Sequence, residues 1–223
     1  METLPPELIQ LILGYADDMT LAKACMVNRR MAYRVCNNTL WVNKIVNKFN
    51  LDMEQINTYK GGNSYAAYYF YLSEIFSYEN FADDDDVLIY GSTIGRPDLV
   101  IIALQRGADV RVDDDISIML AIRGNYYDIV KILLDYGAKN GTALITAANE
   151  GYADIVKLLL DYGANVHAEN EGALVNAVTK GYNDIVRMLL ENGANPHIHQ
   201  GYILSVAEWS GNSDLINILN EYL

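Results

Sequence analysis

Three histidines are the side chains best suited by type to hold a metal ion: His167, His197 and His199. His167 and His197 each follow a recurring aspartate by thirteen residues, so they occupy equivalent loops of two successive repeating units. Equivalent points on packed helical units lie about 10 Å apart, whereas two ligands of one zinc ion each bond it at about 2 Å. We therefore expect no metal site and no cofactor.

Two runs of aspartate, residues 83–86 and 113–115, each precede an expected helix. Acidic side chains there can cap the helix and oppose the positive end of its dipole. Neither run has the alternating ligands and the glycine of a calcium loop. The chain also lacks a phosphate-binding loop, a zinc-ligand spacing and a Gly-x-Ser-x-Gly nucleophile turn. We expect no catalytic residues and no enzymatic activity.

The net charge of −13 is spread unevenly along the chain. Residues 1–60 sum to +1, so the remainder carries −14. This balance argues against nucleic acid, whose phosphates require lysine and arginine. It mildly favours a basic partner; the alternative is that much of the acidic excess forms a solvated face. No apolar run reaches the ~18–20 residues of a membrane span, and the N-terminus does not resemble a secretory signal. With only two cysteines, Cys25 and Cys36, the composition favours the cytoplasm or the nucleus and no membrane contact.

A sequence segment of eleven residues recurs through the C-terminal two thirds of the chain. It reads Asp-Ile-Val-Lys-Leu-Leu-Leu-Asp-Tyr-Gly-Ala from Asp154, with copies or looser copies beginning at Asp98, Asp128, Asp184 and Asp214. The spacings are 30, 26, 30 and 30 residues. Self-similarity with a period in this range indicates a solenoid of stacked helical units, which binds other molecules along an extended surface.

Glycine and small residues divide each unit into two helices. Three residues before the aspartate stands a glycine or asparagine, which tolerates positive φ, and the glycine near the end of the recurring segment ends the second helix. Seven residues before the aspartate stands Gly91, Ala121, Ala147, Ala177 or Ala207, which allows neighbouring helices to approach closely. The unit is thus helix, tight turn, helix, Gly-Ala and loop.

This unit resembles the ankyrin repeat, although the family's Thr-Pro-Leu-His opening is missing and the period is about three residues shorter than its 33. The resemblance covers residues 82–223 and implies about five repeats: 82–110, 111–139, 140–166, 167–196 and 197–223. The shortfall lies in the loops, so the projecting fingers should be short, and almost absent at residues 138–141. This abbreviated form is similar to the ankyrin proteins of large amoeba-infecting DNA viruses, which would imply host–virus interaction inside a host cell.

The ankyrin resemblance also implies where a target protein binds. In that family the concave groove is lined by the first helices and the fingers, and the positions four and five residues before the aspartate face it. These positions vary between units while the framework repeats, as a tailored binding face would. The expected target-binding residues are Arg123, Asn149, Glu150, Thr179, Lys180 and Trp209. Trp209 is the expected anchor, because Trp and Arg dominate interface hot spots; alternatively, it covers the open end of the stack.

Residues 1–45 do not share the repeat and are expected to form three short helices. They contain Leu4-Pro5-Pro6-Glu7-Leu8, Ile12-Leu13, Leu21, Val27-Asn28-Arg29-Arg30-Met31 and Leu40-Trp41, in that order. The segment resembles an F-box, with Asn28 and Met31 in place of the family's usual Cys and Trp. The alternative is a helical cap for the solenoid.

The F-box resemblance implies a Skp-type adaptor as partner and, through it, a cullin. The residues expected to bind the adaptor are Leu4, Pro5, Leu8, Ile12, Leu21, Val27 and Met31. Residues 46–81 form a helical linker whose aromatic helix should run from Tyr65 to about Ile75, after a turn at residues 60–64. That helix either packs inside the protein or presents an aromatic surface to a ligand.

The sequence therefore predicts an all-α protein with an N-terminal three-helix F-box, a linking helix and a solenoid of about five short ankyrin repeats. The predicted function is a non-catalytic substrate-recognition subunit of a Skp–cullin–F-box ubiquitin ligase. The alternatives are an ankyrin interaction or sequestering module without ligase function, and a decoy that occupies the adaptor without delivering a target.

Overall fold

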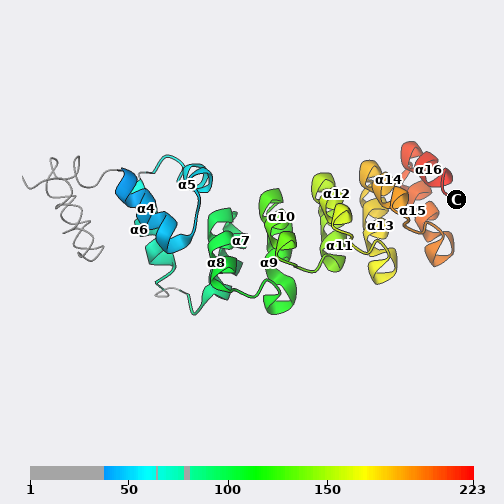
Figure 1. The fold of residues 1–223 in the computed structure, drawn as a ribbon. Coiled ribbons are helices and arrows are strands. Elements are labelled where there is room, and N and C mark those ends of the chain that lie inside the picture. The colour runs from blue at the N-terminus through cyan, green and yellow to red at the C-terminus, as the bar shows by residue number, and fades with distance from the viewer. Residues whose placement is uncertain (1–37, 64, 78–80) are drawn as a thin grey trace, which may run out of the picture. The chain divides into compact units, whose positions relative to one another are not determined.

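The computed structural model describes residues 38–63, 65–77 and 81–223, and its chain divides into two compact units, Met1–Ala82 and Asp83–Leu223. Every regular element of the described residues is helical, which confirms the all-α prediction (Figure 1). None of the described helices is long and apolar enough to cross a membrane. The three helices expected within residues 1–36 lie outside the described residues.

The described part of the first unit consists of α4 (Asn38–Phe49), α5 (Met53–Tyr59) and α6 (Tyr65–Ile75). Asp52 begins α5 through a capping box, in which its side chain accepts from the Gln55 amide and the Gln55 side chain accepts from the Asp52 amide. The prediction of a helix from Tyr65 to Ile75 is confirmed. α4 continues to Phe49, beyond the F-box boundary expected at residue 45.

Aromatic packing holds α4 against α6. The Trp41 ring is 1% exposed, and its centroid lies 5.4 Å from that of Tyr69 and 5.3 Å from that of Phe70. Phe49 contacts Tyr69 and Phe76 with centroids 5.9 Å apart in both cases. Such tilted pairs add about 0.5–1.5 kcal/mol each beyond the burial of their area. Much of the aromatic character of α6 is therefore used to build this small core.

The second unit contains five consecutive helix pairs (Figure 1). The pairs are α7 (Asp84–Ile94) with α8 (Pro97–Arg106), α9 (Val112–Arg123) with α10 (Tyr127–Asp135), α11 (Gly141–Glu150) with α12 (Ala153–Asp161), α13 (Ala168–Lys180) with α14 (Asn183–Glu191), and α15 (Tyr202–Ser210) with α16 (Ser213–Asn220). First helices pack on first helices and second helices on second helices along the series. A 3₁₀ turn, Ile198–Gly201, precedes α15.

The tight turn of each pair depends on the predicted positive-φ residue. Gly95, Gly151, Gly181 and Gly211 have φ values of 72°, 81°, 76° and 68°, and Asn125 has 55°. At Gly151 a second constraint applies, because an added Cβ would lie 2.7 Å from Cζ of Tyr182, in the turn of the next pair. Tyr126 covers Gly95 in the same way, at 2.6 Å. These glycines therefore also provide the space in which a tyrosine of the following repeat packs.

The small residues expected between helices are buried where the two helices of a pair meet. Ala121, Ala147, Ala177 and Ala207 are 0% exposed. A Cβ added at Gly91 of α7 would lie 3.0 Å from Cβ of Leu99 in α8. The close approach predicted for these positions is confirmed.

The connections between pairs are short, as expected, but one of the two acidic runs at the start of a first helix differs from its prediction. No strand occurs in any loop of residues 83–223, and only five residues separate α10 from α11. Asp83 caps α7 as predicted, accepting from the Asp86 amide at 3.1 Å. The capping prediction for the second acidic run is wrong, because Asp113, Asp114 and Asp115 have φ of 48°, 54° and 64°. Glu169, Asn170 and Glu171 form the same left-handed turn at the start of α13.

Candidate protein-interaction surfaces

The six residues expected to bind a target all lie at the ends of first helices. Arg123 ends α9, Asn149 and Glu150 end α11, Thr179 and Lys180 end α13, and Trp209 is the second-last residue of α15. Because the units repeat and their first helices pack on each other, these ends follow one another along the stack. We call this set of six residues the first-helix row.

The polar members of the row differ in how they are engaged. The hydroxyl of Thr179 donates to the carbonyl oxygen of Val175 at 2.7 Å, within its own helix. The Asn149 amide donates to Oε1 of Glu150 at 3.3 Å. Arg123 and Lys180 are exposed and make no hydrogen bond or ion pair with any residue that the structure describes. The two cations are thus available to a partner, whereas the exposed Thr179 hydroxyl has its donor hydrogen already engaged and can only accept.

Trp209 is 91% exposed, far more than any other large apolar side chain among the described residues. If the Trp209 indole covered the end of the stack, it would be buried. Its exposure excludes that alternative. Trp is enriched among the residues that contribute most to binding at protein interfaces, so this exposed ring is a candidate anchor for a partner.

Most cations of the second unit are already engaged by the protein itself. Six of the nine Lys and Arg side chains in residues 83–223 bond to an acidic side chain or a backbone carbonyl: Arg96, Arg106, Arg111, Lys131, Lys139 and Arg187. Arg123, Lys157 and Lys180 are the three without such a contact among the described residues. Two of the three belong to the first-helix row.

In the first and second units, an acidic residue at the start of the first helix accepts a hydrogen bond from the loop that follows the helix pair. Asp85 accepts from the Asp109 amide at 2.6 Å, and the equivalent Asp115 accepts from the Lys139 amide at 2.9 Å. The carboxylate of Asp115 is 5% exposed, so this charge-assisted bond is made out of water. The local sequence suggested capping here, and the spatial partner 24 residues away could not be read from it.

The equivalent residue in the fourth unit, Glu171, engages one of the candidate metal-binding histidines. Its Oε1 lies 2.5 Å from Nδ1 of His167, and its Oε2 is buried without a partner among the described residues. No group of three or more His, Cys, Asp or Glu side chains in the described part of the chain is arranged to hold a metal ion. His167 therefore serves the left-handed turn in which Glu171 lies.

A polar cluster joins the second and third units on the face of their second helices. Oδ1 of Asp135 accepts a hydrogen bond from the hydroxyl of Tyr162, and its Oδ2 lies 3.1 Å from Nζ of Lys131. The hydrogen bond from Tyr162, and then that from Lys131, hold the pKa of Asp135 below its usual value. The same contacts raise the pKa of Tyr162 and of Lys131.

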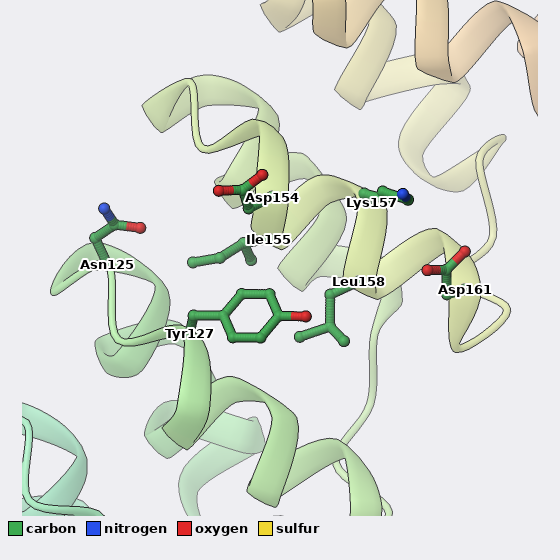
Figure 2. A pocket seen from close by; sticks show the side chains of 7 residues that line it. All are labelled: Asn125, Tyr127, Asp154, Ile155, Lys157, Leu158 and Asp161. Atoms are coloured by element: carbon green, nitrogen blue, oxygen red, sulfur yellow. The ribbon is translucent and has the colours of Figure 1, made fainter.

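Beside this cluster, a cleft of about 510 Å³ lies between α10 and α12 (Figure 2). The Tyr127 ring forms one wall and points toward Leu158, while Asp154 and Asp161 stand near opposite ends. The remaining lining residues are Asn125, Ile155 and Lys157. Of the equivalent positions in the five units, only that of Tyr127 is aromatic, the others being Pro97, Ala153, Asn183 and Ser213. The cleft contains no member of the first-helix row.

Comparison with protein families identifies both parts of the chain. The family described as F-box-like matches residues 1–46, and the family of ankyrin repeats in three copies matches residues 118–200. The chain is an F-box/ankyrin-repeat protein. No curated protein matches it, so the resemblance to viral proteins remains a prediction.

The matched segments contain most of the residues predicted to bind partners. The F-box-like match includes all seven residues expected to contact a Skp-type adaptor, Leu4 to Met31, which lie outside the described residues. The ankyrin match includes five of the six members of the first-helix row, and Trp209 follows it in the fifth helix pair. F-box and ankyrin domains are interaction modules, so this F-box/ankyrin-repeat protein is a protein-interaction adaptor.

Proposed function

We propose that this F-box/ankyrin-repeat protein is the substrate-recognition subunit of a Skp–cullin–F-box ubiquitin ligase. The observation that carries the proposal is the presence in one chain of an F-box-like segment, residues 1–46, and of ankyrin repeats, matched over residues 118–200. An F-box docks on a Skp-type adaptor, and an ankyrin stack binds a protein along its groove. A chain that has both can bring a target to the transfer machinery.

The N-terminal half of the proposal rests on apolar residues. Leu4, Pro5, Leu8, Ile12, Leu21, Val27 and Met31 would contact the adaptor. Trp41, which ends the F-box pattern, is instead buried on α6. The Trp therefore anchors the end of the F-box-like segment to the helices that follow it, and leaves adaptor binding to the residues upstream.

The C-terminal half of the proposal rests on the first-helix row. The exposed indole of Trp209 and the uncompensated charges of Arg123 and Lys180 can all gain contacts in a complex. The protein would contribute proximity: a target held on the row is presented at high effective concentration to a ubiquitin-carrying subunit. Bond formation in the transfer would take place on that other subunit.

A capture experiment separates this proposal from its alternatives. Purified Skp-type adaptor is passed over immobilised wild-type protein and over a Leu4→Ala/Pro5→Ala variant. We expect capture by the wild type and a loss of at least tenfold in the variant. Equal capture by both, or none by the wild type, would leave an ankyrin interaction or sequestering module without ligase function.

The decoy alternative makes a different prediction about the target. In a reconstituted reaction, a protein bound to the first-helix row is ubiquitinated if the chain is a ligase subunit. If the adaptor and the row-bound protein assemble on the same chain but the bound protein is not modified, the chain is a decoy. A Trp209→Ala/Arg123→Ala variant tests the row, since it should lose the target and keep the adaptor.

A further inference from the structure

The unpaired charges on the first-helix row are positive, although the unit that carries them is acidic overall. Residues 83–223 contain 21 acidic and nine basic side chains, so net charge alone would select a basic partner. In such an acidic environment a cation without an acidic neighbour is the exception. Arg123 and Lys180 are nevertheless exposed and unpaired within the part of the chain that the structure describes.

The contrast with the paired cations shows that the exception is local. Arg106 of α8 lies 2.8 Å from Asp84 of α7, and Arg187 of α14 lies 3.2 Å from Glu221, which follows α16. The only other unpaired cation of the unit among the described residues is Lys157, which lines the cleft on the face of the second helices. A partner that approaches the first-helix row therefore meets charges that the protein does not neutralise by itself.

Each unit from the second to the fifth contributes one charged or aromatic side chain to the row: Arg123, Glu150, Lys180 and Trp209. Arg123 and Trp209 stand five residues before the recurring aspartate of their units, and Glu150 and Lys180 stand four residues before it. We propose that the target segment is acidic opposite Arg123, basic opposite Glu150, acidic opposite Lys180 and apolar at Trp209. This inference rests on the proposed function, of which it specifies the partner.

The spacing of the units sets the spacing of the target motif. First helices of neighbouring units pack together, and packed helices lie about 8–10 Å apart. An extended peptide advances about 3.3 Å per residue, so one unit corresponds to about three residues of target. The preferred segment thus has the pattern acidic-x-x-basic-x-x-acidic-x-x-apolar, or its reverse.

The test is a selection of random twelve-residue peptides from a displayed library on the immobilised full chain. We expect the wild type to enrich peptides with two acidic residues about six positions apart and an apolar residue near one end. An Arg123→Glu/Lys180→Glu variant should lower the frequency of such peptides at least tenfold. Lys157→Glu reverses the third unpaired cation on the other face, and it should leave the selected peptides unchanged.

The opposite results overturn the inference. A wild-type pool dominated by lysine and arginine would mean that the net charge, rather than the row, selects the partner. A pool without enrichment, or one that the Arg123→Glu/Lys180→Glu variant leaves unchanged, also refutes it. Adaptor capture is measured separately through residues 1–46, so a basic pool with intact adaptor binding refutes this inference alone, whereas failed capture refutes the proposed ligase function alone.

Discussion

The contact between Tyr182 and Gly151 predicts that two glycines with similar backbone geometry will differ in their tolerance of alanine. Gly151 and Gly163 have φ of 81° and 74°, so alanine at either residue incurs about 1–2 kcal/mol of left-handed strain. At Gly163 the new Cβ would meet nothing within 4 Å, whereas at Gly151 it would lie 2.7 Å from Tyr182. Overpacking costs about 1–3 kcal/mol. The half-buried Tyr182 ring can rotate outward, so we expect an extra loss of about 1 kcal/mol for Gly151→Ala.

Urea denaturation followed by circular dichroism measures both variants against the wild type. The difference between them should disappear when Tyr182→Ala is added, because the double-mutant cycle then removes the ring that the new Cβ meets. If Gly151→Ala and Gly163→Ala lower the free energy of unfolding equally, the tyrosine does not join the third pair to the fourth as described. A loss that persists in the Tyr182→Ala background would refute the reasoning in the same way.

Three further predictions follow from individual contacts. Asp115→Ala should lower the free energy of unfolding by about 1.5–3 kcal/mol in urea denaturation, because it leaves the Lys139 amide without its charged acceptor; an unchanged midpoint would contradict this. Glu169→Gly should raise the thermal midpoint by removing a side chain at φ of 49°, a gain of about 1 kcal/mol, and a lower midpoint would show that the left-handed turn is not populated. Asp135 has a lowered folded-state pKa, so its stabilisation is present above pH ~4 and is lost as the pH falls below that. The loss of stability in Asp135→Asn, about 0.5 kcal/mol or less for this exposed group, should therefore vanish near pH 2 in thermal melts. A difference between variant and wild type that grows toward low pH would contradict this prediction.

The helix pairs could be predicted because their signals are local. A glycine or asparagine in the left-handed region is required at each tight turn, and an aspartate follows in the first turn of each second helix, as at Gly95 and Asp98. The buried small residues follow from the same repeated spacing. The core position of the aromatic helix could be stated only as one of two alternatives, since composition does not show which face of it finds a partner.

The features that sequence reasoning missed depend on contacts between residues far apart in the chain. Asp115 bonds to a residue 24 positions later, and Tyr182 packs on a glycine 31 positions earlier. Both residue types recur at equivalent positions, as Tyr126 and Tyr182 and as Asp85 and Asp115 show, but the sequence does not reveal which distant residue each one contacts. The left-handed turns at residues 113–115 and 169–171 were unexpected because single-residue propensities disfavour three successive non-glycine residues with positive φ. The cleft had one available signal, the aromatic ring of Tyr127 at a position where the other units have none.

The central claim is that separate parts of this chain bind the adaptor and the target. Isothermal titration calorimetry of the full chain with a purified Skp-type adaptor tests it most directly, using Leu8→Asp and Trp209→Ala as matched variants that keep the wild-type circular dichroism spectrum. We predict one adaptor bound per chain, with binding abolished by Leu8→Asp and unchanged by Trp209→Ala. No heat of binding for the wild type, or the same affinity for wild type and Leu8→Asp, would contradict the account.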